Sequence, residues 1–414
     1  MTSLCVRGAA EVIPCGGGGP LRGRDLDSMT VLHGASVTSE GDRVTGLGEP
    51  AGAAVEVDAS GCMVVPGFVD PHTHLPFCGW RADEDAARLS GVRYESLHET
   101  EGGIYRSARM LEEASDETVL AFSRALAGSM LRRGTTTFET KSGYGLSVPS
   151  ELRQLRVARR LGRLVPQQVV HTCLAAHAVP KDKSQGRWIG EAADELLPRA
   201  AEEGLASACD IYVESIAFAL EHAARLAETA SSLGWRMRVH ADQLEDGQAG
   251  AFAARWRFAT ADHLNHTSPE AAGDIARSDT VAVLLPGATF TLRQAKKPPA
   301  RTLVDEGAIV ALGSDLNPGT SPIHSMPFVM ALACRLYGLR PLEALAASTV
   351  NAAVALGLGD TGFLAPGARA DLVVLEGTSF DEVAYRPDHD AVVAVVCGGE
   401  LASVAPGAEE RVRR

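Results

Sequence analysis

The feature that most constrains the fold is a regular alternation of short apolar runs and amphipathic helical patterns, which begins near residue 64. The candidate strands cover residues 64–69, 135–139, 169–175, 210–214, 237–240, 259–264, 280–285 and 308–312. Helical patterns cover residues 118–132, 150–162, 191–203 and 218–233, and another follows the last strand at 341–356. Parallel strands are joined by crossover helices, so this alternation predicts an α/β fold, namely a (β/α)8 barrel of the TIM type.

The two ends of the chain have β character instead. Short strand-like pieces occur at residues 30–32 and 53–57, and two more follow the barrel pattern at 372–375 and 391–397. We therefore predict one small β-sandwich built from both termini, in which residues 1–63 and 362–414 flank a barrel of residues 64–361. The closing stretch Glu-Glu-Arg-Val-Arg-Arg is expected to fray.

Ionisable and polar side chains follow almost every predicted strand. In chain order they are His72 and His74, Lys141 and Tyr144, His177, Glu214, His240, His263, and Asp315. The active sites of such barrels lie at the carboxyl ends of the strands. The sequence therefore predicts that these side chains share one site.

Four of these residues form a set suited to a metal ion. Alternate residues of an extended segment point the same way, so His72 and His74 project together. Alone, each motif has a plainer explanation: two loop histidines, a core histidine at His240, and a turn-capping aspartate at Asp315. Together, three imidazoles and one carboxylate suit one divalent ion with an open position for water. No lysine follows the fourth strand, where binuclear barrels carry a bridging lysine, so one metal is expected.

Composition excludes some classes of partner. The net charge of −13 argues against general binding of nucleic acid or of anionic membranes. The eight cysteines show no Cys-x-x-Cys spacing, which is typical of reduced thiols in a cytoplasmic protein. Cys78 follows His74 closely enough to be considered as a further ligand. We find no secretory leader and no apolar run of about 18 residues that could span a membrane.

The segments at the strand ends carry a set of motifs, which are Asp70-Pro71-His72-Thr73-His74-Leu75, Gly79-Trp80-Arg81, Gly134-Thr135-Thr136-Thr137, Lys141-Ser142-Gly143-Tyr144-Gly145-Leu146, Ala176-His177-Ala178-Val179-Pro180, His240-Ala241-Asp242-Gln243, Ala261-Asp262-His263-Leu264, and Ser314-Asp315-Leu316-Asn317-Pro318-Gly319-Thr320-Ser321-Pro322. These motifs resemble those of the amidohydrolase superfamily and, more narrowly, of its imidazolonepropionase family, over nearly the whole chain. The Lys-Ser-Gly-Tyr-Gly-Leu and Asp-x-Asn-Pro-Gly-(Ser/Thr)-Ser-Pro strings are the most specific.

The resemblance implies a role for each matching position. The metal ligands would be His72, His74, His240 and Asp315, and the ion would be zinc or iron. Substrate would be contacted by Arg81, Tyr144, His177 and Gln243. The product end would be held by Asn317, Gly319 and Thr320. The histidine of the sixth strand, His263, would lie near the metal-bound water.

The resemblance also implies a reaction, the hydrolysis of 4-imidazolone-5-propanoate to N-formimidoyl-L-glutamate in histidine degradation. Arg81 would bind the propionate carboxylate in a bidentate fork, which reconciles an acidic protein with an anionic substrate. The metal would lower the pKa of its water, Asp315 would take the proton and return it to the leaving nitrogen, and His263 or His177 would steady the oxyanion.

Some features depart from the family pattern and leave alternatives open. Glu101 stands where a glycine is usual, Trp80 where smaller residues are common, and Gln243 where some members have glutamate. One alternative is hydrolysis of another five-membered cyclic amide, such as a hydantoin or thiohydantoin propionate. A more remote one is a non-catalytic assembly protein, although such relatives typically lose metal ligands. Barrels of this kind often pair as homodimers, and the oligomeric state stays open.

Overall fold

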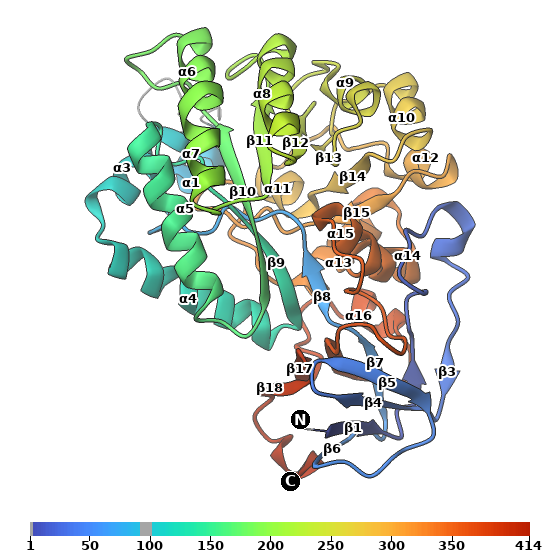
Figure 1. Cartoon of the computed structure of the whole chain (residues 1–414). Helices are drawn as coiled ribbons and strands as arrows, with labels where there is room; N and C mark the ends of the chain where they lie inside the picture. The colour runs from blue at the N-terminus through green and yellow to red at the C-terminus, as the bar shows by residue number, and fades with distance from the viewer. Residues whose placement is uncertain (1–2, 92–101) are drawn as a thin grey trace.

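Eight parallel strands form the central sheet of the larger part of the molecule, in a computed structural model that describes residues 3–91 and 102–414 (Figure 1). In sheet order they are β8 (Phe68–Asp70), β9 (Thr135–Lys141), β10 (Gln168–Ala176), β11 (Ala208–Val213), β12 (Arg236–Ala241), β13 (Thr260–His263), β14 (Val281–Leu284) and β15 (Val310–Leu312). Every neighbouring pair is parallel. The predicted (β/α)8 barrel is confirmed.

The sheet closes just beyond the ends of its first and last strands. The carboxylate of Asp70 accepts hydrogen bonds from the backbone N–H and the hydroxyl of Ser314. The N–H of Asp315 donates to the carbonyl of His72 at 3.0 Å, and the N–H of His74 donates to the carbonyl of Leu316 at 2.8 Å. Closure therefore brings the segments that follow β8 and β15 side by side.

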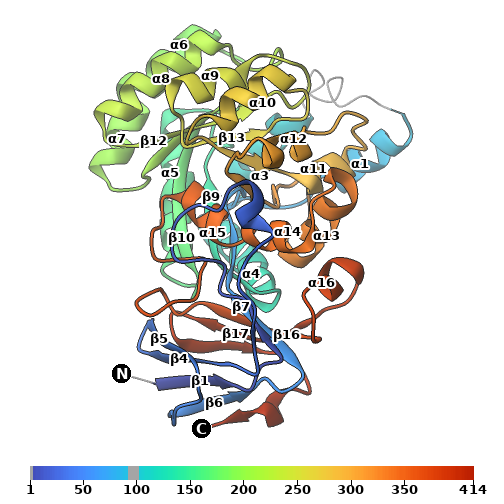
Figure 2. The same cartoon turned by 90° about the vertical axis from the view of Figure 1, so that its right-hand side faces the viewer.

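Helices surround this sheet, as Figure 2 shows from the side. They are α1 (Ala82–Leu89), α3 (Gly103–Glu113), α4 (Asp116–Arg132), α5 (Val148–Gly162), α6 (Gln185–Glu191), α7 (Leu197–Glu202), α8 (Leu220–Ser232), α9 (Ala249–Trp256), α10 (Pro269–Ala276), α11 (Pro286–Thr291), α12 (Ala300–Asp305), α13 (Met326–Tyr337), α14 (Pro341–Ala347) and α15 (Val350–Leu356). Several begin as their sequences indicate. The Ser115 and Ser147 hydroxyls, for example, accept the free N–H groups that open α4 and α5.

Both termini build two further sheets, which lie together at one end of the molecule (Figures 1 and 2). The first contains β19 (Val412–Arg413), β6 (Val55–Asp58), β1 (Ser3–Arg7), β4 (Ser36–Glu40) and β5 (Arg43–Gly48). The second contains β18 (Glu400–Val404), β17 (Val392–Cys397), β16 (Leu372–Glu376), β7 (Cys62–Pro66), β2 (Glu11–Val12) and β3 (Leu32–His33). A short helix, α16 (Asp381–Tyr385), links β16 to β17. The predicted β-sandwich from both ends is confirmed.

The central strands of the second sheet, β7 and β16, are buried on both faces. Val64 and Val374 pack against the first terminal sheet, whereas Val65 and Val373 belong to the core cluster of the barrel. Successive side chains of a strand point to opposite faces, so a sheet between two cores needs apolar residues at every position. This explains the unbroken apolar runs in β7 and β16.

The structure corrects four details of the predicted elements. Residues 64–69 do not form one strand, because the chain leaves β7, which pairs with β16, and turns at Gly67 into β8. The predicted helix 341–356 is broken at Thr349, whose φ and ψ of −134° and −98° are not helical. The predicted helix 191–203 is the second half of a longer helix that starts at Gln185 and passes through a π-helical turn. The closing residues do not fray, since β19 pairs with β6.

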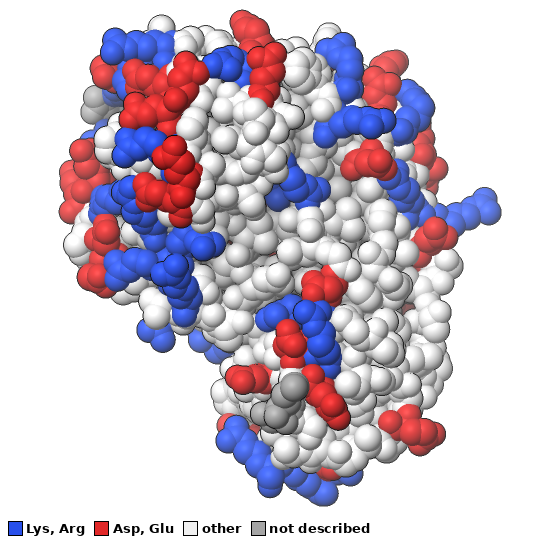
Figure 3. Space-filling model, viewed as in Figure 1, with Lys and Arg blue, Asp and Glu red and all other residues white. Residues whose placement is uncertain are grey.

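Acidic and basic side chains are interspersed on the face shown in Figure 3, with the densest gathering over the helices at its upper left. Among the residues that the structure describes, no helix is both long and apolar enough to cross a membrane.

Candidate active site

Three histidines and one aspartate converge at the carboxyl ends of the barrel strands. The Nε2 atom of His74 lies 3.3 Å from Nε2 of His72 and 3.5 Å from Nε2 of His240. Oδ1 of Asp315 lies 3.2 Å from Nε2 of His74 and 3.6 Å from Nε2 of His72. All four side chains are buried. The structure thus brings together the four residues for which the sequence predicted a metal.

Two buried carboxylates face the other nitrogen of two of these imidazoles. Oδ2 of Asp262 lies 2.5 Å from Nδ1 of His72, and Oδ1 of Asp210 lies 3.2 Å from Nδ1 of His240. An ionised carboxylate only accepts hydrogen bonds, so each Nδ1 carries the proton and each Nε2 presents a lone pair. Carboxylates that hold histidines in this way orient metal ligands in many proteins.

This donor set fits a divalent cation. The Nε2 lone pairs of His72 and His240 both face Nε2 of His74. Oδ1 of Asp315, which has no hydrogen-bond partner among the described residues, lies beside His72 and His74. Such a cluster of acceptors is repulsive unless a cation lies between them. Imidazole nitrogen and carboxylate oxygen are ligands that zinc and iron both accept.

The charges inside the barrel lead to the same conclusion. Lys141 lies 2.8 Å from Glu139 and 2.7 Å from Asp210, and Arg238 lies 3.3 Å from Glu139. With Asp262 and Asp315, four carboxylates therefore face two cations, an excess that one divalent ion balances. Burial, and then the nearby charge of Asp210, raises the pKa of Asp262 to about 7, because this negative charge is unfavourable until a cation offsets it.

Two further histidines lie beside the cluster and are neutral. The ring of His263 is 5.3 Å from that of His240, and burial lowers its pKa to about 3. The ring of His177 stacks on His74 with centroids 4.9 Å apart, and burial holds its pKa well below the usual value. Nδ1 of His177 lies 3.2 Å from the carbonyl of Gly143, so this nitrogen donates and Nε2 is left as an acceptor.

Arg81 is a buried cation with free donors at the mouth of the site. Its Nε and Nη1 have no hydrogen-bond partner within residues 3–91 and 102–414, although Nη1 lies 3.6 Å from Glu84. The backbone N–H of Arg81 donates to the carbonyl of Pro318. The guanidinium packs flat against Gly319, where a Cβ atom would lie only 1.8 Å from Nη2. Gly319 therefore makes room for Arg81 rather than facing the cavity.

The loop after β15 is tied together by Asn317. Its Oδ1 accepts from the N–H groups of Gly319 and Thr320, and its Nδ2 donates to the Asp315 carbonyl at 2.7 Å. Asn317 and Thr320 still line the cavity beside the metal cluster. Asn317 thus both caps the turn, as asparagine often does, and lines the site.

The Lys-Ser-Gly-Tyr-Gly-Leu motif forms a loop that places Tyr144 against His177, with ring centroids 5.2 Å apart. The buried carboxylate of Glu151 on α5 accepts the N–H groups that flank Tyr144, at 2.7–2.9 Å. Glycine is required on both sides of the tyrosine: a Cβ at Gly143 would lie 2.9 Å from His177, and one at Gly145 would lie 2.3 Å from the Glu151 backbone.

The cavity enclosed by these groups is narrow, with a volume of about 30 Å³. Its lining consists of His74, Arg81, Ile104, Tyr144, His177, Tyr212, His240, Gln243, His263, Asp315, Asn317 and Thr320. Except for His72, behind the other imidazoles, and Gly319, beneath Arg81, this lining contains every residue to which the resemblance assigned a role. Two other residues predicted at strand ends lie outside it: Lys141 is paired with Glu139 and Asp210 inside the barrel, and Glu214 accepts the N–H of Gln243.

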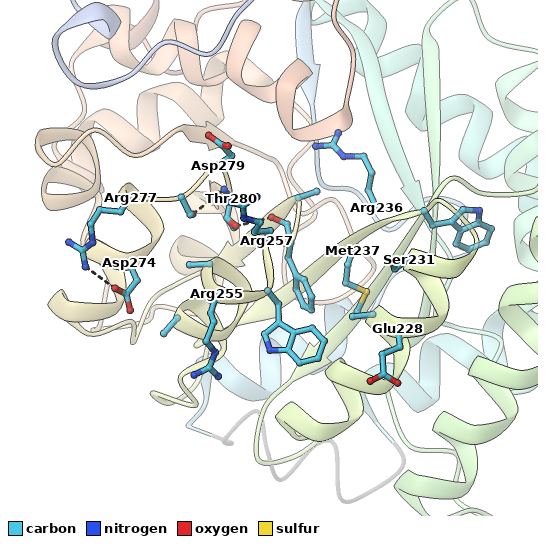
Figure 4. Close-up of a pocket in the computed structure, with 18 of the residues that line it drawn as sticks. Glu228, Ser231, Arg236, Met237, Arg255, Arg257, Asp274, Arg277, Asp279 and Thr280 are labelled. Carbon is cyan, nitrogen blue, oxygen red and sulfur yellow. Dashed lines mark hydrogen bonds and ion pairs between the residues drawn. The ribbon is translucent and has the colours of Figure 1, made fainter.

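A larger cavity of about 1300 Å³ lies at the opposite end of the barrel, where β12, β13 and β14 begin (Figure 4). Three of its charged groups are already engaged, since Arg277 pairs with Asp274 at 2.7 Å and Arg236 donates to the Val354 carbonyl. Catalytic groups of barrels lie at the carboxyl ends of strands, so the smaller cavity is the candidate active site.

Three features of the sequence fall outside the cavity lining. Trp80 is 36% exposed and packs edge-on against Phe77 and Phe122. Cys78 joins an apolar cluster and is absent from the groups of described residues that could hold a metal. Glu101 lies outside the described residues.

Sequence analysis placed Glu214 at the site but assigned no role to any of the carboxylates that support it. Asp210 and Asp262 orient two histidines, and Glu151 and Glu214 accept backbone N–H groups of the site loops. A signal for Asp210 was present, because it stands two residues before Tyr212 and four before Glu214, on the side of the strand that faces inward.

Comparison with known proteins identifies the class. A model of the amidohydrolase family matches residues 63–402. Among solved structures, a triazine hydrolase variant superposes with a TM-score of 0.74 at 17% identity, covering 97% of this chain and 94% of that one. A zinc-bound adenosine deaminase from Xanthomonas campestris gives a TM-score of 0.69 at 17% identity, covering 97% and 93%. The chain belongs to the amidohydrolase family.

Closer relatives narrow this assignment. An imidazolonepropionase of Symbiobacterium thermophilum is 40% identical over 411 residues, which are 96% of each chain. One from Rubrobacter xylanophilus is 41% identical over 97% of this chain and 98% of its own, and one from Paracoccus denitrificans is 43% identical over 84% and 88%. Within its family the chain thus groups with the imidazolonepropionases, and it is a hydrolase.

Proposed function

We propose that this protein hydrolyses 4-imidazolone-5-propanoate to N-formimidoyl-L-glutamate, with one zinc or iron ion held by His72, His74, His240 and Asp315. The observation that carries the proposal is the pairing of this cluster with a buried arginine, two of whose donors have no hydrogen-bond partner among the described residues, in a chain about 40% identical to imidazolonepropionases. We place the enzyme in the cytoplasm on its composition.

Arg81 would bind the propionate tail. Its Nε and Nη1, which have no hydrogen-bond partner in the part of the chain that the structure describes, suit a carboxylate, which accepts a planar guanidinium in a bidentate geometry. This contact fixes one end of the substrate, so the ring lies toward His74 and Tyr144.

His177 and His263 would have different roles at the ring. The Nδ1 proton of His177 is used on the Gly143 carbonyl, so its Nε2 can only accept, for instance from a ring N–H. His263 has no such bond, and its Nδ1 lacks a partner among the described residues. His263 is therefore the better donor to the developing oxyanion, with Gln243 and Tyr144 orienting the ring.

Asp315 would move the proton. A zinc or iron ion held there would lower the pKa of water so that it could attack at neutral pH. Asp315 would take a proton from the attacking water as the water oxygen bonds to the ring carbonyl carbon, and would return this proton to the ring nitrogen as the C–N bond breaks. Burial favours the neutral form of Asp315, but its interactions with His74 and the surrounding imidazoles outweigh burial and lower its pKa, so it starts as a carboxylate. Asn317 and Thr320 would hold the product end.

The test is a substrate panel. We expect loss of the imidazolone ultraviolet absorbance and appearance of N-formimidoyl-L-glutamate, at a kcat/KM at least a hundredfold above that for hydantoin and thiohydantoin propionates. A higher kcat/KM for a hydantoin would move the assignment to another cyclic amidohydrolase. Removal of the metal should abolish turnover, and added zinc should restore it.

A further inference from the structure

The turn that follows β12 carries Gln243 into the cavity, and its backbone is unusual. Asp242 has a left-handed conformation, with φ of +52°. Its carboxylate accepts from the N–H groups of Ala249 and Gly250 at 3.0 and 3.2 Å, which fixes the start of α9. A residue in this conformation ends the strand, so the main chain at Gln243 needs partners outside the sheet.

Those partners hold the Gln243 main chain on both sides. Oε1 of Glu214 accepts its N–H at 2.5 Å and the next N–H, of Leu244, at 2.9 Å. Nε2 of Gln294 donates to the Gln243 carbonyl at 3.1 Å. The side chain of Gln243 is thereby left free to face the cavity that it lines.

Glu214 is well placed to act as the anchor. It follows β11, the strand next to β12, is 5% exposed, and its own N–H donates to the Phe218 carbonyl. Burying a carboxylate is costly, and its second oxygen has no partner among the described residues. All the described hydrogen bonds of this buried side chain go to one turn of the site. Packing alone does not require a carboxylate at this position.

We propose that Glu214 is a positioning residue, which sets the place of the Gln243 amide against the substrate ring. This inference rests on the proposed function, because it takes Gln243 as a substrate contact. Glu214 lies outside the cavity lining, so it acts through the backbone of Gln243 and not on the substrate itself.

The experiment is a double-mutant cycle read on steady-state kinetics with 4-imidazolone-5-propanoate. Glu214→Ala removes the acceptor, and we expect KM to rise about tenfold, the value of one lost hydrogen bond, with kcat and metal content nearly unchanged. Glu214→Gln should restore KM, because a single oxygen accepts both N–H groups and an amide oxygen can replace it. In a Gln243→Ala background, Glu214→Ala should have no further effect on KM.

A matched control separates positioning from stability. Glu343 is also buried and accepts a backbone N–H, that of Arg340, but it lies at the start of α14. Glu343→Ala should lower the melting temperature and leave KM unchanged. If Glu214→Ala does not fold, Glu214→Asp keeps the charge and withdraws the oxygens by about 1.5 Å, and it should still raise KM.

Two results would overturn the inference: an unchanged KM in both Glu214→Ala and Glu214→Asp, or an equal rise in KM with and without Gln243. The proposed function fails differently. If Gln243→Ala alone kept the wild-type KM and kcat, Gln243 would not be a substrate contact.

Discussion

Replacing Arg81 by methionine should cripple substrate binding without disturbing the metal site. Arg81 is buried at the mouth of the cavity, and two of its donors are unpaired among the described residues. A substrate carboxylate bound there would be desolvated on one side and paired on the other. Breaking such a buried charged pair costs roughly 2–5 kcal/mol, because the remaining charge is left without a partner.

Converted to rates, this loss is a fall of about 30- to 5000-fold in kcat/KM, since each 1.36 kcal/mol is a factor of ten. Gly319→Ala should act in the same direction. Its Cβ would lie 1.8 Å from Nη2 of Arg81, so the guanidinium has to leave its position. Gly190→Ala is the matched control, because nothing lies within 4 Å of the Cβ that it adds.

The assay is kcat/KM for 4-imidazolone-5-propanoate and for the same ring without its carboxylate, with metal content measured in parallel. Arg81→Met and Gly319→Ala should both lose kcat/KM for the full substrate. For the ring without its carboxylate, the kcat/KM of each variant should stay close to that of wild type. An unchanged kcat/KM for the full substrate in Arg81→Met would show that the tail is held elsewhere.

Three further changes test separate parts of the account. Asp315→Asn should abolish turnover, whereas Gln243→Glu should keep substantial activity with an altered pH–rate profile; comparable collapse of both with metal still bound would give Gln243 a chemical role. Asp262→Asn should weaken zinc binding by about 10- to 100-fold, because His72 loses the acceptor that orients it, and chelator competition on the apo-protein will show whether affinity is unchanged instead. Burial raises the pKa of Glu214 from 4.5 to about 7, so its contribution to stability is complete below pH 4.5 and is lost as the pH rises through 7. Between pH 4.5 and pH 8, the free energy of unfolding of Glu214→Gln, measured in urea, should therefore rise relative to that of wild type by on the order of 3 kcal/mol. Parallel curves of this free energy against pH for the two proteins would contradict that pKa.

The barrel could be predicted because its signal is local. Each strand and helix shows its own periodicity, and polar residues such as His177 and His240 stand where apolar runs end. The join between the two parts of the molecule could not be predicted in this way. The apolar run at 64–69 reads as one strand, yet it changes sheets at Gly67, where a Cβ would lie 2.1 Å from the Thr136 hydroxyl.

The supporting groups of the site depend on contacts that no local pattern reveals. Asp262 meets His72 across the barrel, and the two are 190 positions apart. Glu151 stands in an ordinary helical sequence, and Glu214 is recognisable only as an acid after a strand; the carboxylates of both act on loops that only the folded chain brings near. Sequence analysis could therefore name the residues that face the substrate and the metal, but not the contacts that hold them in place.

The most direct test of the central claim is the metal content of the purified protein and of His240→Ala, measured by elemental analysis. The account predicts one zinc or iron ion per wild-type chain, and loss of the metal together with activity in a variant that still shows the wild-type circular dichroism spectrum. Stoichiometric metal retained in His240→Ala, or a wild-type protein that turns over substrate after complete removal of metal, would contradict it.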